Sequence, residues 1–289
     1  MRMYLSSMTY EALLRLHELR PDVKVHILRS YLNDGPGTFK VLLNMPPNVL
    51  SVACDSNTYH ITTNDNEHNQ DIETHAHFVK NNSSFYPIMF NFDIEHGDDG
   101  TEACWENQYE LERRGLNIVP VIQNLEYEVP HVIERGDELV AIGSTRMKKM
   151  DEINDATDEL YRNNICTHLF GVGSMAKLLG TKAWSSDCSS FGKWIASGRA
   201  IWFDEVSQKE ISFAFRKYNK KGKMNPDYIR EHILGKKYQE WLWEHLGVEI
   251  EDLFNDHNLK LAVNAYYFWE LEQRVTQSQK DAGIHFKHW

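Results

Sequence analysis

Three carboxylates, one amide and one glycine stand directly after short apolar runs of the sequence. The residues in these positions are Asp55 with Ser56, Asp93, Gln123, Gly143 and Asp187. A single Asp after a strand more often caps the next helix than acts in catalysis, but the same placement after several runs favours a shared site. Carboxylates that lie close together raise the pKa of at least one of them, so one can attack while another moves a proton. Glycosyl transfer uses such a pair.

The apolar runs themselves are typical of buried parallel strands. They are Val23–Leu28, Leu50–Cys54, Pro87–Phe92, Ile118–Ile122, Leu139–Ile142, Thr167–Phe170, Ala183–Ser185 and Arg199–Phe203. Helical patterns at Thr101–Arg114 and Lys148–Asn163 lie between them. Strands that alternate with helices predict an α/β fold, and a total near eight favours a (β/α)₈ TIM barrel over an open sheet. The active site of such a barrel lies at the carboxyl ends of the strands, where the polar residues stand.

The composition changes after the last of these runs. Residues 1–203 are expected to form the main part of the TIM-barrel catalytic domain, and residues 204–289 a C-terminal basic and helical extension packed on the barrel. Lysine and arginine side chains at the start of the extension could hold phosphates, or equally form an ordinary solvated surface. The candidates for nucleic-acid contact are Arg216, Lys217, Lys220, Lys221 and Lys223.

The overall composition limits the classes of protein to consider. With 289 residues, 42% of them hydrophobic, the chain can bury the core of one barrel domain. It has 42 Asp and Glu against 31 Lys and Arg, so a nucleic-acid partner would depend on a local basic patch. No stretch resembles a signal peptide or a membrane span, which favours a soluble, cytoplasmic protein.

Neither a metal nor another cofactor is expected. Four cysteines stand far apart in the sequence, as expected for reduced thiols: Cys54, Cys104, Cys166 and Cys188. Three histidines, His68, His75 and His77, are close together, but no acidic or cysteine residue pairs with them in a ligand spacing. We therefore interpret them as surface histidines.

The order of the strand-end residues resembles that of the tRNA-guanine transglycosylase (queuine tRNA-ribosyltransferase) superfamily, over roughly residues 50–195. The segment Asp55-Ser-Asn-Thr-Tyr59-His is similar to the family's Asp-Ser-Gly-Gly-Tyr/Phe-Gln, although both glycines are lost. The segment His168-Leu-Phe-Gly-Val-Gly173 is similar to its Tyr-Leu-Met-Gly-Val-Gly strand. Ser-Asp187-Cys follows at a family-like spacing and is similar to its Phe-Asp-Cys nucleophile segment.

The resemblance implies a site that exchanges a purine on a nucleic-acid sugar. Asp187 would attack C1′ of the sugar, and Asp55 would carry the proton of the departing and incoming bases. Other residues would read the polar edge of the purine, while Tyr59 and Phe170 would stack on its faces. The expected substrate-binding residues are Ser56, Tyr59, Asp93, Gln123, Gly143, Phe170 and Gly171.

Departures from the family indicate which branch the chain resembles most. The cysteine and histidine spacing of the family's zinc subdomain is missing. A shortened chain of this kind looks more like the divergent relatives that insert 7-deazaguanine bases into DNA than like the tRNA enzymes. DNA is therefore the favoured partner, with tRNA as the alternative, a 7-deazaguanine base as the small-molecule substrate and a helper protein as a further partner to test. Simple glycoside or nucleoside hydrolysis and a non-catalytic nucleic-acid-binding barrel stay open.

Overall fold

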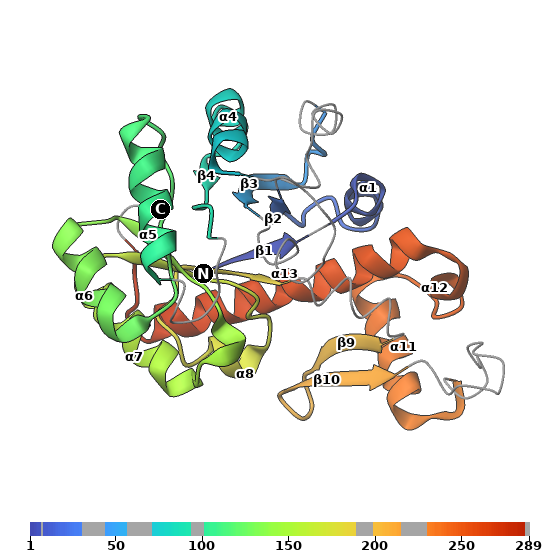
Figure 1. The fold of residues 1–289 in the computed structure, drawn as a ribbon. Helices are drawn as coiled ribbons and strands as arrows, with labels where there is room; N and C mark the ends of the chain where they lie inside the picture. Colours follow the sequence, from blue (N-terminus) through green and yellow to red (C-terminus); the bar gives the residue numbers. More distant parts are fainter. Residues whose placement is uncertain are drawn as a thin grey trace, which may run out of the picture.

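Parallel strands form the centre of the molecule (Figure 1). The computed structural model describes residues 1–6, 8–30, 44–56, 71–93, 101–188, 199–214 and 230–286. Within them, an 8-stranded sheet has the order β4-β3-β2-β1-β8-β7-β6-β5. The strands are β1 (Arg2–Ser6), β2 (Val25–Ser30), β3 (Val49–Asp55), β4 (Ile88–Met89), β5 (Val121–Ile122), β6 (Leu139–Ile142), β7 (Cys166–Leu169) and β8 (Ser185–Cys188).

The two outer strands of this sheet also meet. A parallel bridge joins Phe90, just after β4, to Val119, just before β5. The N–H of Asn91 donates to the carbonyl oxygen of Val119 at 2.9 Å, and the N–H of Val119 donates to that of Met89 at 2.8 Å. The sheet therefore curls onto itself, with its strands in sequence order around a ring. The expected (β/α)₈ TIM-barrel fold is confirmed.

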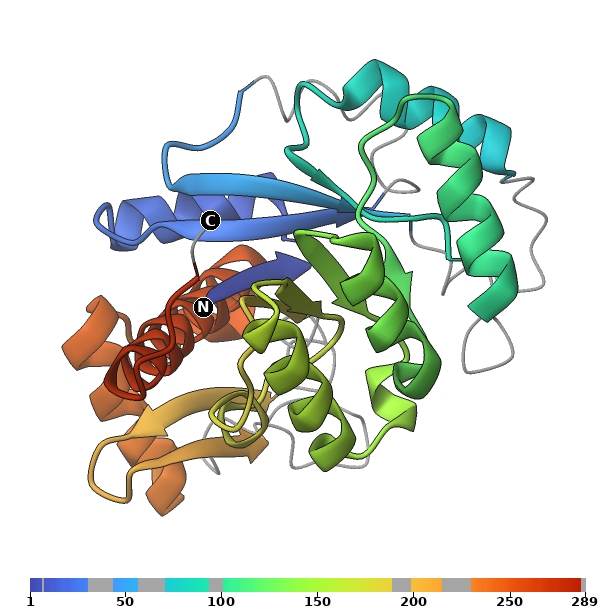
Figure 2. The same cartoon turned by 90° about the vertical axis from the view of Figure 1, so that its left-hand side faces the viewer.

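Helices alternate with the strands and cover the outside of the sheet (Figure 2). They are α1 (Tyr10–Leu19), α4 (Ile72–Asn82), α5 (Thr101–Arg113), α6 (Leu125–Arg135), α7 (Met150–Arg162) and α8 (Met175–Leu178). Local signals set their limits: the Thr9 hydroxyl accepts from the N–H of Ala12 at the start of α1, and Gly136, at φ 74°, ends α6 in the left-handed conformation. The two helices predicted between strands are both present, as α5 and α7. No helix in the described ranges has the length and apolar character needed to cross a membrane.

One predicted barrel strand was wrong, and one real strand was missed. The run Arg199–Phe203 lies in β9 (Arg199–Asp204), which pairs antiparallel with β10 (Lys209–Ala214) in a separate two-stranded sheet. Its place in the barrel is taken by β1, which pairs in parallel with both β2 and β8. The strongly apolar run near residue 200 was therefore wrongly assigned to the barrel, and the less apolar run Arg2–Ser6 was not predicted as a strand.

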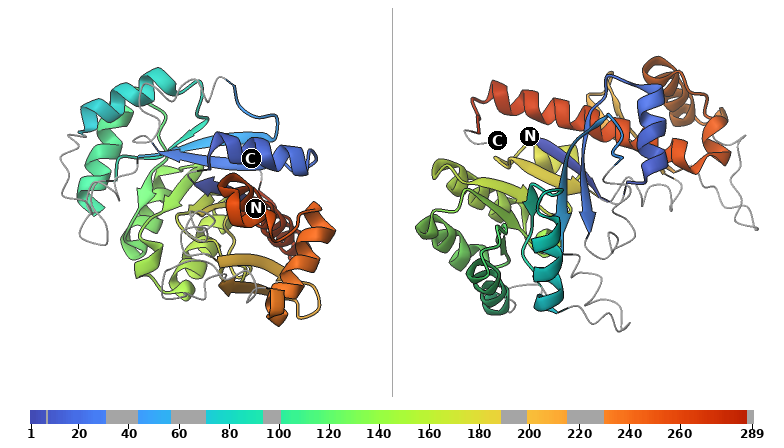
Figure 3. Two further views of the ribbon diagram at one scale, coloured as in Figure 1. Left: turned by 90° about the vertical axis from the view of Figure 1, so that its right-hand side faces the viewer. Right: turned by 90° about the horizontal axis from the view of Figure 1, so that it is seen from above.

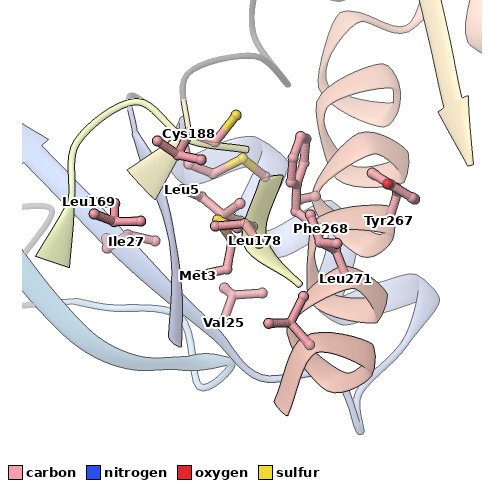
Figure 4. Close-up of a cluster of buried hydrophobic side chains, with 14 of the residues drawn as sticks. Met3, Leu5, Val25, Ile27, Leu169, Leu178, Cys188, Tyr267, Phe268 and Leu271 are labelled. Atoms are coloured by element: carbon pink, nitrogen blue, oxygen red, sulfur yellow. The ribbon is translucent and has the colours of Figure 1, made fainter. Parts of the chain in front are cut away.

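The long C-terminal helix is part of the barrel wall. Among the described residues, three helices follow β10: α11 (Ile233–Leu246), α12 (Asp252–Asn255) and α13 (His257–Asp281), the last with 25 residues. Helix α13 contacts β1 and α1, and it lies beside β1 in the views of Figures 2 and 3. Its Phe268 and Leu271 share a buried apolar cluster with Met3 and Val25 (Figure 4). Residues 204–289, expected as an extension, thus supply the helix that follows β8 in a (β/α)₈ barrel.

A largely buried carboxylate on α13 fixes the start of β1. Glu272 accepts a hydrogen bond at 2.7 Å from the N–H of Met3, and its side chain is 11% exposed. Burial raises the pKa of the Glu272 carboxyl from 4.5 to about 7. The folded protein therefore holds this proton more tightly than the unfolded chain does. The contribution of Glu272 to the free energy of unfolding is therefore expected to fall as the pH rises from 4.5 to 7, as its carboxyl becomes ionised.

Changing Glu272 to Gln should remove this part of the pH dependence. The amide oxygen can still accept from Met3, but no charge is buried, so we expect the free energy of unfolding at pH 8 to rise by on the order of 1–3 kcal/mol. Urea unfolding followed between pH 5 and pH 8 measures the effect. The control is Glu244→Gln on the exposed face of α11. An unchanged pH slope in Glu272→Gln would show that this carboxyl does not titrate with folding.

Candidate active site at the mouth of the barrel

Strand alternation brings the predicted site residues to one end of the barrel. Tyr4, Ala53, Val121 and Ala141 form part of a buried cluster separate from the one between sheet and helices, so these side chains face the barrel interior. The residue two positions further along each strand faces the same way. Two positions after these four residues stand Ser6, Asp55, Gln123 and Gly143. In the same way, Phe170 follows His168 on β7, and Asp187 follows Ser185 on β8. All stand at carboxyl ends of parallel strands and so converge on the mouth of the barrel.

The Asp187 carboxylate is held by hydrogen bonds on both of its oxygens. The residue is 6% exposed. Oδ2 accepts from the Ser6 hydroxyl at 2.6 Å, and Oδ1 accepts from the N–H of Gly171 at 2.7 Å. Gly171 has φ +70°, a conformation that a glycine adopts without strain and that turns its N–H toward the carboxylate. Gly171, predicted to bind substrate, therefore contacts the predicted nucleophile directly.

A second polar group surrounds Asp93 on the far side of the ring. Its Oδ1 accepts from the Ser56 hydroxyl at 2.9 Å, and Oδ2 lies 3.4 Å from Nε2 of Gln123. All three residues are buried. Strands β4 and β8 are four places apart in the ring order, so Asp93 and Asp187 face each other across the mouth. The predicted nucleophile and the predicted base-reading group thus occupy opposite walls.

The absence of a side chain at Gly143 leaves room for the amide of Gln123. A Cβ atom on Gly143 would lie 2.5 Å from Nε2 of Gln123, so the Gln123 amide can occupy its position only beside a glycine. The N–H of Gly143 donates to the carbonyl oxygen of Ile122 at 2.9 Å and so belongs to the strand ladder. Among the described residues, Oε1 of Gln123 is buried without a hydrogen-bond partner. An unpaired buried acceptor is costly in a folded protein and is a natural contact for a ligand.

The backbone of Gln123 is fixed by a residue that was not predicted. Glu128, 1% exposed, accepts from the N–H groups of Gln123 and Asn124 through one carboxylate oxygen. Its other oxygen accepts from the indole N–H of Trp105 at 2.6 Å. Burial raises the pKa of the Glu128 carboxyl, and these three donors oppose that rise. Glu128 therefore holds the turn after β5 in place beneath the mouth.

The other described site residues border the same space. Asp55 is half-buried at the end of β3, next to Ser56. The Phe170 ring is half-buried and packs edge-on against Phe90, with ring centroids 4.8 Å apart. The carbonyl oxygen of Phe170 accepts from the hydroxyl of Thr145 at 2.6 Å, which joins the turns after β6 and β7. Phe170, predicted to stack on the base, and Asp55, predicted to carry its proton, thus both lie at the mouth.

Several predictions fall outside the residues that the structure describes. They concern Tyr59, Arg216, Lys217, Lys220, Lys221 and Lys223, and of the histidines His68. The interpretation of His75 as a surface residue was wrong: it is 2% exposed and stacks on Phe92, and burial lowers its pKa to about 4. Its position on the inward face of α4 explains this. His77 is exposed, and the described ranges contain no group of three or more His, Cys, Asp or Glu residues suited to a metal ion.

The fold and the site together define a (β/α)₈ barrel with carboxylates on opposite walls of its mouth. No protein-family model matches the chain, and no curated protein matches it. Among solved structures, it is similar to the crystal structure of a protein provisionally described as a fructose-1,6-biphosphate aldolase from Coccidioides immitis, with 9% identity and a TM-score of 0.50. The similarity covers 98% of this chain and 92% of the other. At this identity it shows a common fold alone.

Proposed function

We propose that the chain is a guanine transglycosylase, which exchanges guanine in nucleic acid, with DNA favoured over tRNA, for a 7-deazaguanine base. The supporting observation is the arrangement of the mouth. Asp187 has a carboxylate fixed by Ser6 and Gly171 on one wall, and the Asp93 and Gln123 group lies on the other. A nucleoside bound between them would meet a nucleophile at its sugar and polar groups at its base.

The proposed reaction consists of two displacements on the same carbon. A carboxylate oxygen of Asp187 attacks C1′ of the sugar, the bond from C1′ to the guanine nitrogen breaks, and guanine leaves with the bonding electrons and a proton from Asp55. The replacement base then gives its proton to Asp55 and attacks C1′. The ester bond breaks, and its electrons return to the Asp187 carboxylate. Two displacements exchange the base without a net loss of the glycosidic bond.

The base-reading group suits the edge of a guanine-like base. A carboxylate such as Asp93 accepts from ring and exocyclic N–H groups, while an amide such as Gln123 both donates and accepts. The buried oxygen of Gln123, which has no hydrogen-bond partner in the described part of the chain, would gain a donor from such a base. Simple hydrolysis needs two carboxylates and no purine readers, so this group favours exchange over a glycosidase.

An exchange assay tests the proposal. Wild-type protein is incubated with labelled guanine and, in parallel, with duplex DNA, single-stranded DNA and bulk tRNA. We expect the label to enter DNA. Entry into tRNA alone would make tRNA the substrate, release of free base without uptake would indicate a hydrolase, and binding without either reaction would indicate a non-catalytic barrel.

Changing Asp93 to Ala should weaken base binding more than folding. Loss of a charged hydrogen-bond partner is expected to raise the KM for the incoming base by about 10- to 100-fold. Ser56→Ala removes only the hydroxyl that orients Asp93, so its effect should be smaller. The control is Asp151→Ala in the exposed first turn of α7. Steady-state exchange kinetics measure the difference, and an unchanged KM in Asp93→Ala would remove this residue from the site.

A further inference from the structure

His168 is a buried histidine inside the barrel, next to the proposed nucleophile. It faces the interior from β7 and is 0% exposed. Its Nδ1 lies 2.8 Å from the hydroxyl of Ser185, and its Nε2 lies 3.6 Å from Oδ1 of Asp187. The second distance is too long for a hydrogen bond, but it brings the nitrogen beside the carboxylate. Among the described residues, Nε2 has no hydrogen-bond partner.

Aromatic rings hold the imidazole in this orientation. The rings of Phe90 and Phe170 each have their centroid 4.8 Å from that of His168, and Tyr4 approaches edge-on at 5.9 Å. Close packing of this kind favours the orientation in which Nδ1 lies near Ser185 and Nε2 lies near Asp187.

The contacts at the two ring nitrogens favour a proton on Nε2 over a proton on Nδ1 alone. If Nδ1 carried the proton, a lone pair on Nε2 would face the Asp187 carboxylate. If Nε2 carries it, the N–H points toward the carboxylate, and the Ser185 hydroxyl can donate to Nδ1. The second arrangement is favourable at both nitrogens. A shift of a few tenths of an ångström would complete a hydrogen bond from Nε2 to Oδ1.

We propose that His168 is a positioning residue for Asp187. Its Nε2–H acts with the Ser6 hydroxyl and the Gly171 N–H to orient the carboxylate and to stabilise the negative charge that returns when the glycosyl ester breaks. No proton passes to or from His168. This inference rests on the proposed function, because it assumes that Asp187 forms the ester.

Two substitutions distinguish the contribution of Nε2 of His168 from that of Nδ1. Glutamine can place an amide N–H near the position of Nε2, so His168→Gln keeps a donor for Asp187. The shorter asparagine reaches only the position of Nδ1, so His168→Asn can keep the Ser185 contact but loses that donor. Both put an uncharged amide in the same buried space. A purely structural role for His168 predicts similar losses of activity in both variants.

We expect His168→Asn to lower kcat for exchange by about 10- to 100-fold with KM unchanged, and His168→Gln to recover most of that loss. Near-UV circular dichroism checks that both variants keep their packing. Equal kcat values in the two folded variants would overturn the inference while leaving the proposed function standing. If the wild type exchanges no base, it is the proposed function that fails.

Nuclear magnetic resonance tests the pair without any activity. In a long-range ¹H–¹⁵N spectrum, the His168 signals are identified by their loss in His168→Gln. We expect the form protonated on Nε2, and a shift of the Nε2 signal in Asp187→Asn. A proton on Nδ1, or an Nε2 signal unaffected by Asp187→Asn, would contradict the positioning role even in a preparation that exchanges no base.

Discussion

Asp187→Asn should reduce base exchange by at least about 1000-fold and leave the fold intact. The amide has the shape of the carboxylate, and its oxygen can still accept from Ser6 or Gly171. It is not a nucleophile toward C1′, so neither displacement can proceed through it. The loss should appear in kcat, with nucleic-acid binding retained.

Single-turnover exchange and filter binding, done on the same preparation, measure the two effects. The matched control is Asp151→Asn, which removes an exposed carboxylate from α7. The role assigned to Asp187 is wrong if the Asn variant keeps full exchange activity. Loss of nucleic-acid binding together with a lower melting temperature would instead assign Asp187 a structural role.

Glu128→Ala should have the largest effect on stability among the site residues. The change leaves the N–H groups of Gln123 and Asn124 and the indole N–H of Trp105 without their buried acceptor. Each unsatisfied buried donor costs about 1–3 kcal/mol, and partial relaxation brings the expected total to about 3–5 kcal/mol. Because Gln123 follows β5 directly, the base-reading group should be displaced as well.

Urea unfolding measures this loss. Glu126→Ala, on the exposed face of the same helix, is the control and should change the free energy of unfolding by less than about 0.5 kcal/mol. Glu128→Gln should fall between the two, because its amide oxygen can replace one carboxylate oxygen but its NH₂ group would face the Trp105 donor. A Glu128→Ala protein as stable as the wild type would contradict the contacts described for this carboxylate.

The barrel was predictable because most of its strands are continuous apolar runs. Two strands were predicted wrongly: Arg199–Phe203 was assigned to the barrel, and Arg2–Ser6 was missed. Both are strands, but a run of apolar residues does not show whether its partner is parallel or antiparallel, and Arg2 and Ser6 make β1 less apolar than its neighbours. The sequence also did not indicate that α13 packs beside β1 as part of the barrel, because the β9 and β10 hairpin separates it from β8 in the sequence.

The predicted site consists of residues that end strands, and this position can be read in the sequence. Asp55, Gln123 and Asp187 were found in this way. Ser6 could have been found with β1, from the same alternation. His168 and Glu128 could not, because their partners lie on other elements and their importance comes from burial beside Asp187 and Gln123.

The most direct test of the proposed mechanism is mass spectrometry of the protein trapped with its nucleic-acid substrate by rapid denaturation. We expect a covalent adduct whose mass corresponds to a sugar-linked nucleic-acid fragment on the peptide that contains Asp187, present in the wild type and missing in Asp187→Asn. An adduct on another residue, or exchange activity without any adduct, would contradict the assignment of Asp187 as the nucleophile.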